Sequence, residues 1–258
     1  MLGVMTDHAG GPSGAGSSAG ARADTGGARG GTDAGGGADT VRPTPRHFTM
    51  IRNLQLADLF TLGNGFAGTG AVLALLQSAR ARGPGVDDGV DYIFFWVAVA
   101  LMPLALIMDI LDGRIARMRA KVSPLGQELD SLADLISFGV APAAMAFVVG
   151  MDGGWDAPAL MFFVVCGLGR LARYNVTATE VARTGGPSAK VTHFEGFPIP
   201  SSLFLVAGMA ALRLAGHTGS TLPLGALQLG PCQLHPLVAV FALHGCAMIS
   251  RTLRIPKL

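Results

Sequence analysis

Charged residues are scarce in this chain. Asp, Glu, Lys and Arg make up 14% of its 258 residues, hydrophobic residues make up 50%, and the mean hydropathy is +0.47. Ordinary soluble domains contain about 25% charged residues. The formal net charge is only +2, and no basic patch is interleaved with aromatic residues, which argues against a nucleic-acid partner. The composition therefore predicts a protein embedded in the lipid bilayer.

Cysteine is also rare. Cys166, Cys232 and Cys246 are far apart in the sequence, and none belongs to a CxxC or His-Cys ligand spacing. We therefore expect neither a disulfide framework nor a zinc site.

The N-terminal part lacks the residues that a folded segment needs. Residues 1–45 consist mostly of Gly, Ala, Ser, Thr and Asp, which bury too little apolar surface to offset the entropy lost on folding. The segment also lacks a cationic stretch followed by an apolar one, so we expect no cleaved signal peptide. The sequence predicts a disordered cytoplasmic tail, after which the first membrane-spanning helix acts as its own insertion signal.

What the chain does contain is a series of apolar segments between residues 46 and 258. A helix needs about 20 apolar residues to cross a bilayer, and six segments approach this length. They are residues 57–76, 92–108, 129–149, 157–171, 201–214 and 234–249. We predict an all-α integral membrane domain over residues 46–258, with six transmembrane helices.

The Lys and Arg residues near these segments predict the orientation of the chain, because positive residues beside a transmembrane helix stay preferentially in the cytoplasm. Six crossings bring four basic groups to one side of the membrane. They are Arg42, Arg46 and Arg52, then Arg114, Arg117, Arg119 and Lys121, then Arg170, Arg173, Arg183 and Lys190, and finally Arg251, Arg254 and Lys257. Arg80, Arg82 and Arg213 are exceptions on the other side. We predict that both termini are cytoplasmic and that the protein lies in the cell (inner) membrane.

Four aspartates stand at regular positions beside or inside two of the apolar segments. They are Asp109, Asp112, Asp130 and Asp134. The first two are three residues apart and the last two are four apart, so each pair shares one face of a helix. Ser123-Pro124 lies between the pairs and suits a turn followed by a helix start, which lets the two helices return antiparallel. The sequence thus predicts four carboxylates in one small volume at the cytoplasmic mouth.

Such a cluster is costly unless cations bind to it. Each aspartate costs about 2.5 to 3.5 kcal/mol at the bilayer centre, and mutual repulsion adds to that cost. Hard carboxylate oxygens suit Mg²⁺, Mn²⁺ or Ca²⁺, and two ions about 3.5 to 4 Å apart stabilise both oxygens of a phosphoryl displacement. We predict two divalent ions, Mg²⁺ or Mn²⁺ with Ca²⁺ as the alternative, and phosphotransfer at the membrane surface. Simple pairing of each aspartate with a nearby Arg or Lys is the alternative, and the two shared faces disfavour it.

The complete pattern is Asp109-x2-Asp112-Gly113-x2-Ala116-Arg117-x8-Gly126-x3-Asp130-x3-Asp134. It resembles, without a mismatch, the signature of the CDP-alcohol phosphatidyltransferases, and the resemblance extends over about residues 53–250. It implies that the four aspartates hold two divalent metals, that Asp134 is also the general base, and that the protein forms a homodimer. It implies further that CDP lies along Gly113, Ala116, Arg117 and Gly126. This agrees with the chemistry of the residues, because guanidinium binds phosphate and glycine admits a ligand close to the backbone.

Three further segments resemble the phosphatidylserine synthase branch of that family. They are "LADLFTLGNGFAG" at residues 56–68, "GRLARYNV" at 169–176 and "FEGFPIPSS" at 194–202. The first keeps Thr61 and Asn64 of the branch's Pro-Asn-x-x-Thr-x-x-Asn motif, and the resemblance implies that both contact CDP. Ala57 and Asp58 replace its Pro and Asn. The resemblance implies that CDP-diacylglycerol and L-serine are the substrates, and that phosphatidylserine and CMP are the products.

Serine carries a carboxylate that needs a cationic partner. Arg170 and Arg173 share a helix face, and Lys190 belongs to the same cytoplasmic region. We expect one of these three to bind the serine carboxylate or a substrate phosphate. Anchoring of the helix on the cytoplasmic side is the alternative role.

Two other functions stay open. The same chemistry could use another acceptor, such as glycerol 3-phosphate, an inositol compound or choline. A cation transporter would instead place its carboxylates near the bilayer midplane, within repeated halves, but this sequence has no obvious repeat and places two of them at a helix end.

The sequence also contains a GxGxxG pattern, which is typical of dinucleotide-binding sites. Residues 63–68 match GxGxxG, but no βαβ unit is predicted around them, so a dinucleotide site is not expected. Close helix packing by small residues explains the pattern better.

Overall fold

The structure is a computed structural model that describes residues 56–82, 88–119, 124–184, 193–250 and 254–256. The tail expected at residues 1–45 lies outside this described part, as does Lys190.

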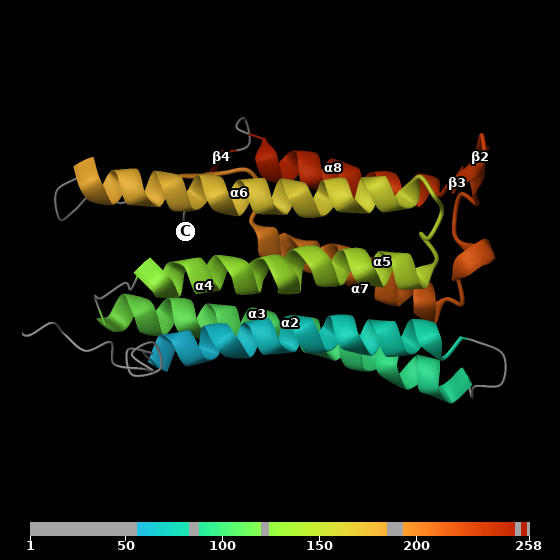
Figure 1. Ribbon diagram of the computed structural model, residues 1–258, viewed down its shortest axis with the longest axis horizontal. Coiled ribbons are helices and arrows are strands. Elements are labelled where there is room, and N and C mark those ends of the chain that lie inside the picture. The colour runs from blue at the N-terminus through green and yellow to red at the C-terminus, as the bar shows by residue number, and fades with distance from the viewer. Residues whose placement is uncertain (1–55, 83–87, 120–123, 185–192, 251–253, 257–258) are drawn as a thin grey trace, which may run out of the picture. The chain divides into compact units, whose positions relative to one another are not determined.

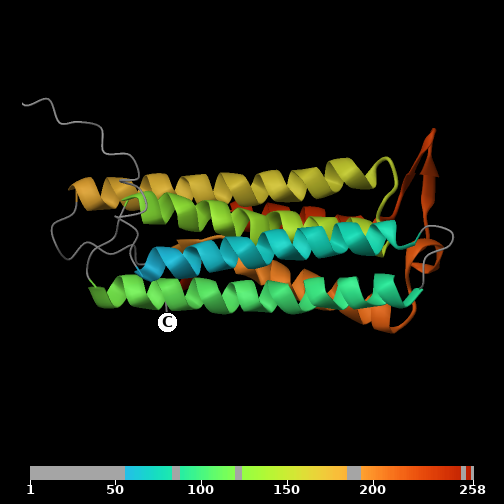
Figure 2. The same ribbon diagram turned by 60° about the horizontal axis from the view of Figure 1, so that its bottom comes forward.

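The long helices are α2 (Leu56–Arg80), α3 (Asp88–Arg119), α4 (Pro124–Asp134), α5 (Ala141–Val149) and α6 (Asp156–Thr184). The π-helix η1 (Leu135–Val140) joins α4 to α5 in one continuous helical run. These helices lie side by side with their axes running in similar directions (Figure 1), and the second view agrees (Figure 2). Four stretches are long and apolar enough to cross a membrane by length and composition. They are Asp58–Arg80, Gly89–Ile115, Leu125–Val149 and Asp156–Glu180.

Two further apolar helical runs are shorter. The 3₁₀ helix η2 (Ile199–Ser202) leads into α7 (Leu203–Leu214), and η4 (Pro236–Val238) leads into α8 (Ala239–Ile249). They occupy the fifth and sixth predicted segments but fall short of the usual spanning length of about 20 residues. The chain between them contains the 3₁₀ turn η3 (Gly219–Thr221).

Two short antiparallel strand pairs were not expected from the sequence. β1 (His193–Glu195) pairs with β4 (Arg254–Pro256), and β2 (Leu227–Leu229) pairs with β3 (Cys232–Leu234). Each strand has only three residues, too few to show a periodic signal. The protein is therefore mostly helical, as predicted for an integral membrane protein.

The helix limits differ from the apolar segments at their polar ends. α3 continues from the apolar part to Arg119, and α6 continues to Thr184. The predicted segments stopped where charged residues begin, but those residues favour helix as much as apolar ones do. α4 begins at Pro124, as the Ser123-Pro124 pair predicted.

Small residues let α2 and α3 pack closely. On α2, Ala67, Ala71 and Ala74 are buried at helical spacing, and on α3 Ala98 and Ala105 are buried on the facing side. Such residues allow backbones to approach in a membrane, where packing replaces the hydrophobic effect as the driving force. The GxGxxG pattern is thus part of a packed helix, as expected, and this packing brings α2 against the helices that carry the aspartates.

Candidate active site

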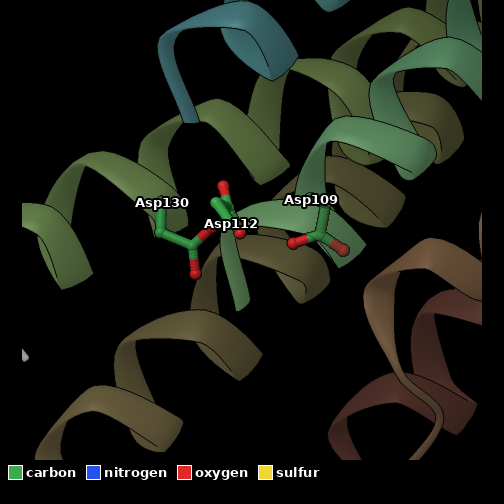
Figure 3. Close-up of side chains that lie close together, drawn as sticks. All are labelled: Asp109, Asp112 and Asp130. Atoms are coloured by element: carbon green, nitrogen blue, oxygen red, sulfur yellow. The ribbon is translucent and has the colours of Figure 1, made fainter. Parts of the chain in front are cut away.

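The four aspartates come from two neighbouring helices. Asp109 and Asp112 lie in the last third of α3, while Asp130 and Asp134 lie on α4. One carboxylate oxygen from each of Asp109, Asp112 and Asp130 lies within 4.8 Å of the others. Figure 3 shows the three side chains close together. The predicted convergence is therefore confirmed for these three residues.

Asp134 is buried beside this group, one helical turn after Asp130. Its charge interacts electrostatically with those of Asp109 and Asp130. Asn64 on α2 donates a hydrogen bond from Nδ2 to Asp134 Oδ1 at 2.9 Å. One oxygen of Asp134 is thus held by an amide.

The first helix supplies a second polar contact. Thr61 Oγ1 donates to Asp112 Oδ2 at 2.8 Å, and both side chains are buried. Asp58, which replaces the Asn of the branch motif, is also buried and interacts electrostatically with Asp112. Thr61 and Asn64 therefore contact the aspartates directly, a position that the sequence motif alone did not reveal.

The donor set fits a divalent cation. Oδ1 of Asp130 is buried and has no hydrogen-bond partner among the described residues. Leaving a buried carboxylate oxygen without a partner is costly, and a hard cation would satisfy it. Oxygen donors from three carboxylates suit Mg²⁺, Mn²⁺ or Ca²⁺ rather than a thiophilic metal.

The remaining signature residues line the same helices. Gly113 directly follows Asp112 on α3, Gly126 lies on α4, and both are partly exposed. Ala116 and Arg117 belong to α3, but their side chains lie outside the described part of the structure.

The helix α6 passes close to the aspartates and carries Arg170 and Arg173. Arg170 interacts electrostatically with Asp134, and its Nε is buried without a hydrogen-bond partner among the described residues. Arg173 Nη1 instead donates to the backbone oxygen of Ile249 at the end of α8, at 3.2 Å. The structure therefore separates the two arginines that the sequence treated alike.

Two contacts of the site escaped the sequence reasoning. Asn175 Nδ2 on α6 donates to Ser131 Oγ on α4 at 3.0 Å, between the two aspartates of that helix. Ser137 Oγ donates to Asn64 Oδ1 at 2.7 Å. Asn175 belongs to the "GRLARYNV" segment, so its polar side chain in an apolar helix was the available signal, whereas nothing in the sequence marked Ser137.

Comparison with known proteins gives a consistent result. The family model for CDP-alcohol phosphatidyltransferase matches residues 54–231. A protein of Saccharomyces cerevisiae named "CDP-diacylglycerol--serine O-phosphatidyltransferase" is 43% identical over 212 residues, which cover 82% of this chain and 74% of the yeast protein. Proteins of the same name from Mycobacterium leprae and Helicobacter pylori strain 26695 are 38% and 43% identical over 47% and 43% of this chain. Those alignments cover 40% and 45% of the two bacterial proteins.

Proposed function

Because this chain belongs to the CDP-alcohol phosphatidyltransferase family, we propose that it transfers the phosphatidyl group of CDP-diacylglycerol to L-serine, giving phosphatidylserine and CMP. The likeness to the yeast protein over 82% of the chain is the observation that carries the choice of serine. The close carboxylates of Asp109, Asp112 and Asp130 supply the site that such a transfer needs.

Each residue of the site has a role in this reaction. Asp134 takes the proton of the serine hydroxyl, whose oxygen then forms a bond to the phosphorus that carries diacylglycerol. The bond from this phosphorus to the CMP oxygen breaks, and CMP leaves with that oxygen. Arg117 binds a phosphate of the nucleotide, while Gly113, Ala116 and Gly126 leave room for CDP beside the backbone.

The aspartates would hold two divalent ions, Mg²⁺ or Mn²⁺ with Ca²⁺ as the alternative, which neutralise charge on the pyrophosphate and on the leaving oxygen when bound. Thr61 fixes the carboxylate of Asp112, and Asn64 fixes that of Asp134. We propose that both residues also contact CDP, as the resemblance implied. Ordered carboxylates lower the cost of arranging ligands around a cation.

We propose the membrane topology that hydropathy and the positions of Lys and Arg predict. α7 and α8 with their preceding 3₁₀ turns would complete six crossings, in a membrane domain over residues 46–258 that follows a cytoplasmic tail over residues 1–45. Both termini and the active site would then face the cytoplasm, in the cell (inner) membrane. A lipid donor would enter from the bilayer and serine from water, and a homodimer is the assembly that we propose.

The acceptor is tested directly with the purified full chain. With CDP-diacylglycerol and Mg²⁺ or Mn²⁺, we expect radiolabelled serine to enter phosphatidylserine with one CMP released per lipid formed. Glycerol 3-phosphate, inositol and choline serve as competing acceptors, and omission of CDP-diacylglycerol or addition of EDTA is the control. Efficient use of another alcohol without use of serine would refute the assignment, and metal uptake into liposomes without CMP release would favour transport.

A further inference from the structure

Three buried polar side chains form a hydrogen-bonded chain that runs from η1 through α2 to Asp134 on α4. Ser137 Oγ donates to Asn64 Oδ1 at 2.7 Å and lies 3.1 Å from the backbone oxygen of the same residue. Asn64 Nδ2 then donates to Asp134 Oδ1 at 2.9 Å. Ser137 and Asn64 are fully enclosed, and Asp134 is buried. No solvent competes for these hydrogen bonds, so they are strong and directional.

The arrangement fixes which part of Asn64 faces Asp134. The amide oxygen is engaged by Ser137, so the amide nitrogen, a donor only, is presented to the carboxylate. With Oδ1 of Asp134 held in this way, the direction of Oδ2 is fixed as well. A base must meet the proton that it takes within hydrogen-bond distance, so orientation of Oδ2 bears directly on the rate.

The local backbone makes room for this contact. Ser137 lies in the π-helix η1, which begins directly after Asp134, and π segments occur frequently at functional sites. A Cβ on Gly68 of α2 would lie 2.2 Å from Ser137 Oγ and 2.8 Å from Ser137 Cα. Glycine at position 68 is therefore required for the π segment to reach Asn64.

We propose that Ser137 is a positioning residue for Asp134 that acts through the side-chain amide of Asn64. The proposal rests on the proposed function, in which Asp134 takes the proton of the acceptor. Ser137 itself touches neither substrate nor metal. Its contribution is the orientation of a carboxylate, and partners of this kind change metal affinity or activity by about 10- to 100-fold.

Removal of one hydroxyl tests the proposal in the full-length protein. Ser137→Ala is expected to lower kcat about tenfold with the KM for serine within about twofold of wild type, and to weaken Mn²⁺ binding measured by electron paramagnetic resonance. In the Asn64→Ala background the same change is expected to lower kcat no further, because a residue that acts only through Asn64 has no effect once that amide is gone.

Ser78→Ala is the matched control, because Ser78 also donates from a buried hydroxyl to a carboxylate, that of Asp91. It should lower the thermal midpoint to a similar extent while leaving kcat unchanged. The proposal is overturned if Ser137→Ala keeps wild-type kcat, or if its effect adds fully to that of Asn64→Ala. The proposed function fails on a different result, namely no transfer from CDP-diacylglycerol to serine by the wild-type chain, whereas full activity of Asp134→Asn would refute only the role of Asp134 as base.

The hairpin of β2 and β3 lies at one end of the helices, near the start of α6 (Figure 1). The register places Leu227 opposite Leu234 and Leu229 opposite Cys232, with Gln228 opposite Gln233. Since side chains alternate between the faces of a strand, one face is apolar and the other carries the two glutamines. Half of the Leu227 and Leu229 surface stays exposed, at 53% and 48%.

Trp155 directly precedes α6 and contacts the backbone of this hairpin. Its indole Nε1 donates to the backbone oxygen of Leu229 at 3.1 Å, while its side chain remains 50% exposed. From Leu214 to Ser250 the sequence contains no Asp, Glu, Lys or Arg. A two-stranded hairpin with exposed leucines is marginal in water, whereas tryptophan is enriched at the membrane–water interface.

We infer that the apolar face of this hairpin and Trp155 lie in the headgroup region of the bilayer, continuous with the lipid-facing surface of the helices. Trp155 reports on this position once Trp96, the only other tryptophan, is replaced in Trp96→Phe. In vesicles with phosphatidylcholine brominated near the headgroup, its fluorescence should fall below that in vesicles of unbrominated lipid, and Leu227→Ser with Leu229→Ser should weaken that quenching. Quenching by aqueous iodide alone would place the hairpin in water, and protection from both quenchers would indicate a second copy of the chain; either result overturns the inference.

Discussion

Replacement of Asp130 by asparagine is expected to lower the rate of CMP release on the order of 1,000-fold without unfolding the protein. The buried Oδ1 of Asp130 has no hydrogen-bond partner among the described residues and lies within reach of two other carboxylates. An amide has the same shape but lacks the charge that a divalent cation requires. Steady-state CMP release and Mn²⁺ binding by electron paramagnetic resonance measure the two consequences.

The stability of Asp130→Asn should not fall with its activity. In metal-free protein, the carboxylates of Asp109, Asp112 and Asp130 repel one another, so removal of one charge relieves repulsion. We therefore expect the thermal midpoint of Asp130→Asn in EDTA to equal or exceed that of wild type. Loss of activity together with a lower midpoint would show that Asp130 serves the fold instead, and retention of the wild-type rate would contradict the metal site.

Asp91→Asn is the matched control, because Asp91 is a buried aspartate of the same helix α3 at the other end of the protein. It accepts hydrogen bonds from Ser78, Arg82 and Arg213, with Arg213 at 2.5 Å and Arg82 at 3.1 Å. Breaking a buried ion pair leaves uncompensated charge and costs about 3 to 5 kcal/mol. We expect a lower thermal midpoint and an unchanged kcat per folded molecule, the reverse of the Asp130→Asn result.

The same ion pairs involve two arginines that did not fit the predicted charge pattern. Arg82 and Arg213 were exceptions to the rule that basic residues lie on the cytoplasmic side. In the structure both contact Asp91, and Arg213 also lies over the ring of Phe95 at 5.1 Å. Sequence reasoning could not anticipate the pair of Asp91 and Arg213, because these residues are 122 positions apart along the chain.

The aspartate cluster could be predicted because its information is local. Spacings of three and four residues fix a shared helix face, and Ser123-Pro124 fixes the turn between α3 and α4. The contacts of Ser137 with Asn64 and of Asn175 with Ser131 instead depend on how α2 and α6 pack against α4. That packing depends on the space left by Gly68 and on the π segment after Asp134, and neither leaves a periodic mark in the sequence.

Helix length was the other limit of the sequence reasoning. Hydropathy identified all six apolar runs, but it could not distinguish α7 and α8 from the four longer helices. It also ended the second and fourth helices too early, because the last turns of α3 and α6 carry charged residues.

Arg170→Gln is expected to raise the KM for serine by about 30-fold or more, while the KM for CDP-diacylglycerol stays near wild type. Loss of a charge-assisted contact to a buried carboxylate costs about 2 to 5 kcal/mol, and about 1.4 kcal/mol corresponds to a factor of ten. The buried Nε of Arg170 has no hydrogen-bond partner among the described residues and lies near Asp134, so a substrate carboxylate placed there would satisfy it. Arg170→Lys should recover part of the affinity, since it restores the charge but not the planar fork.

Arg173→Gln provides the control, because Arg173 shares the helix face but donates to the backbone oxygen of Ile249. Its loss should lower stability slightly and leave the serine KM unchanged. Ethanolamine, which is serine without the carboxylate, sharpens the test. Wild type should strongly prefer serine, whereas Arg170→Gln should lose most of that preference by losing kcat/KM for serine alone. An equal loss for both alcohols would contradict carboxylate binding and would assign Arg170 to a phosphate or to the support of Asp134, since only a contact with the carboxylate can distinguish two acceptors that differ in that group.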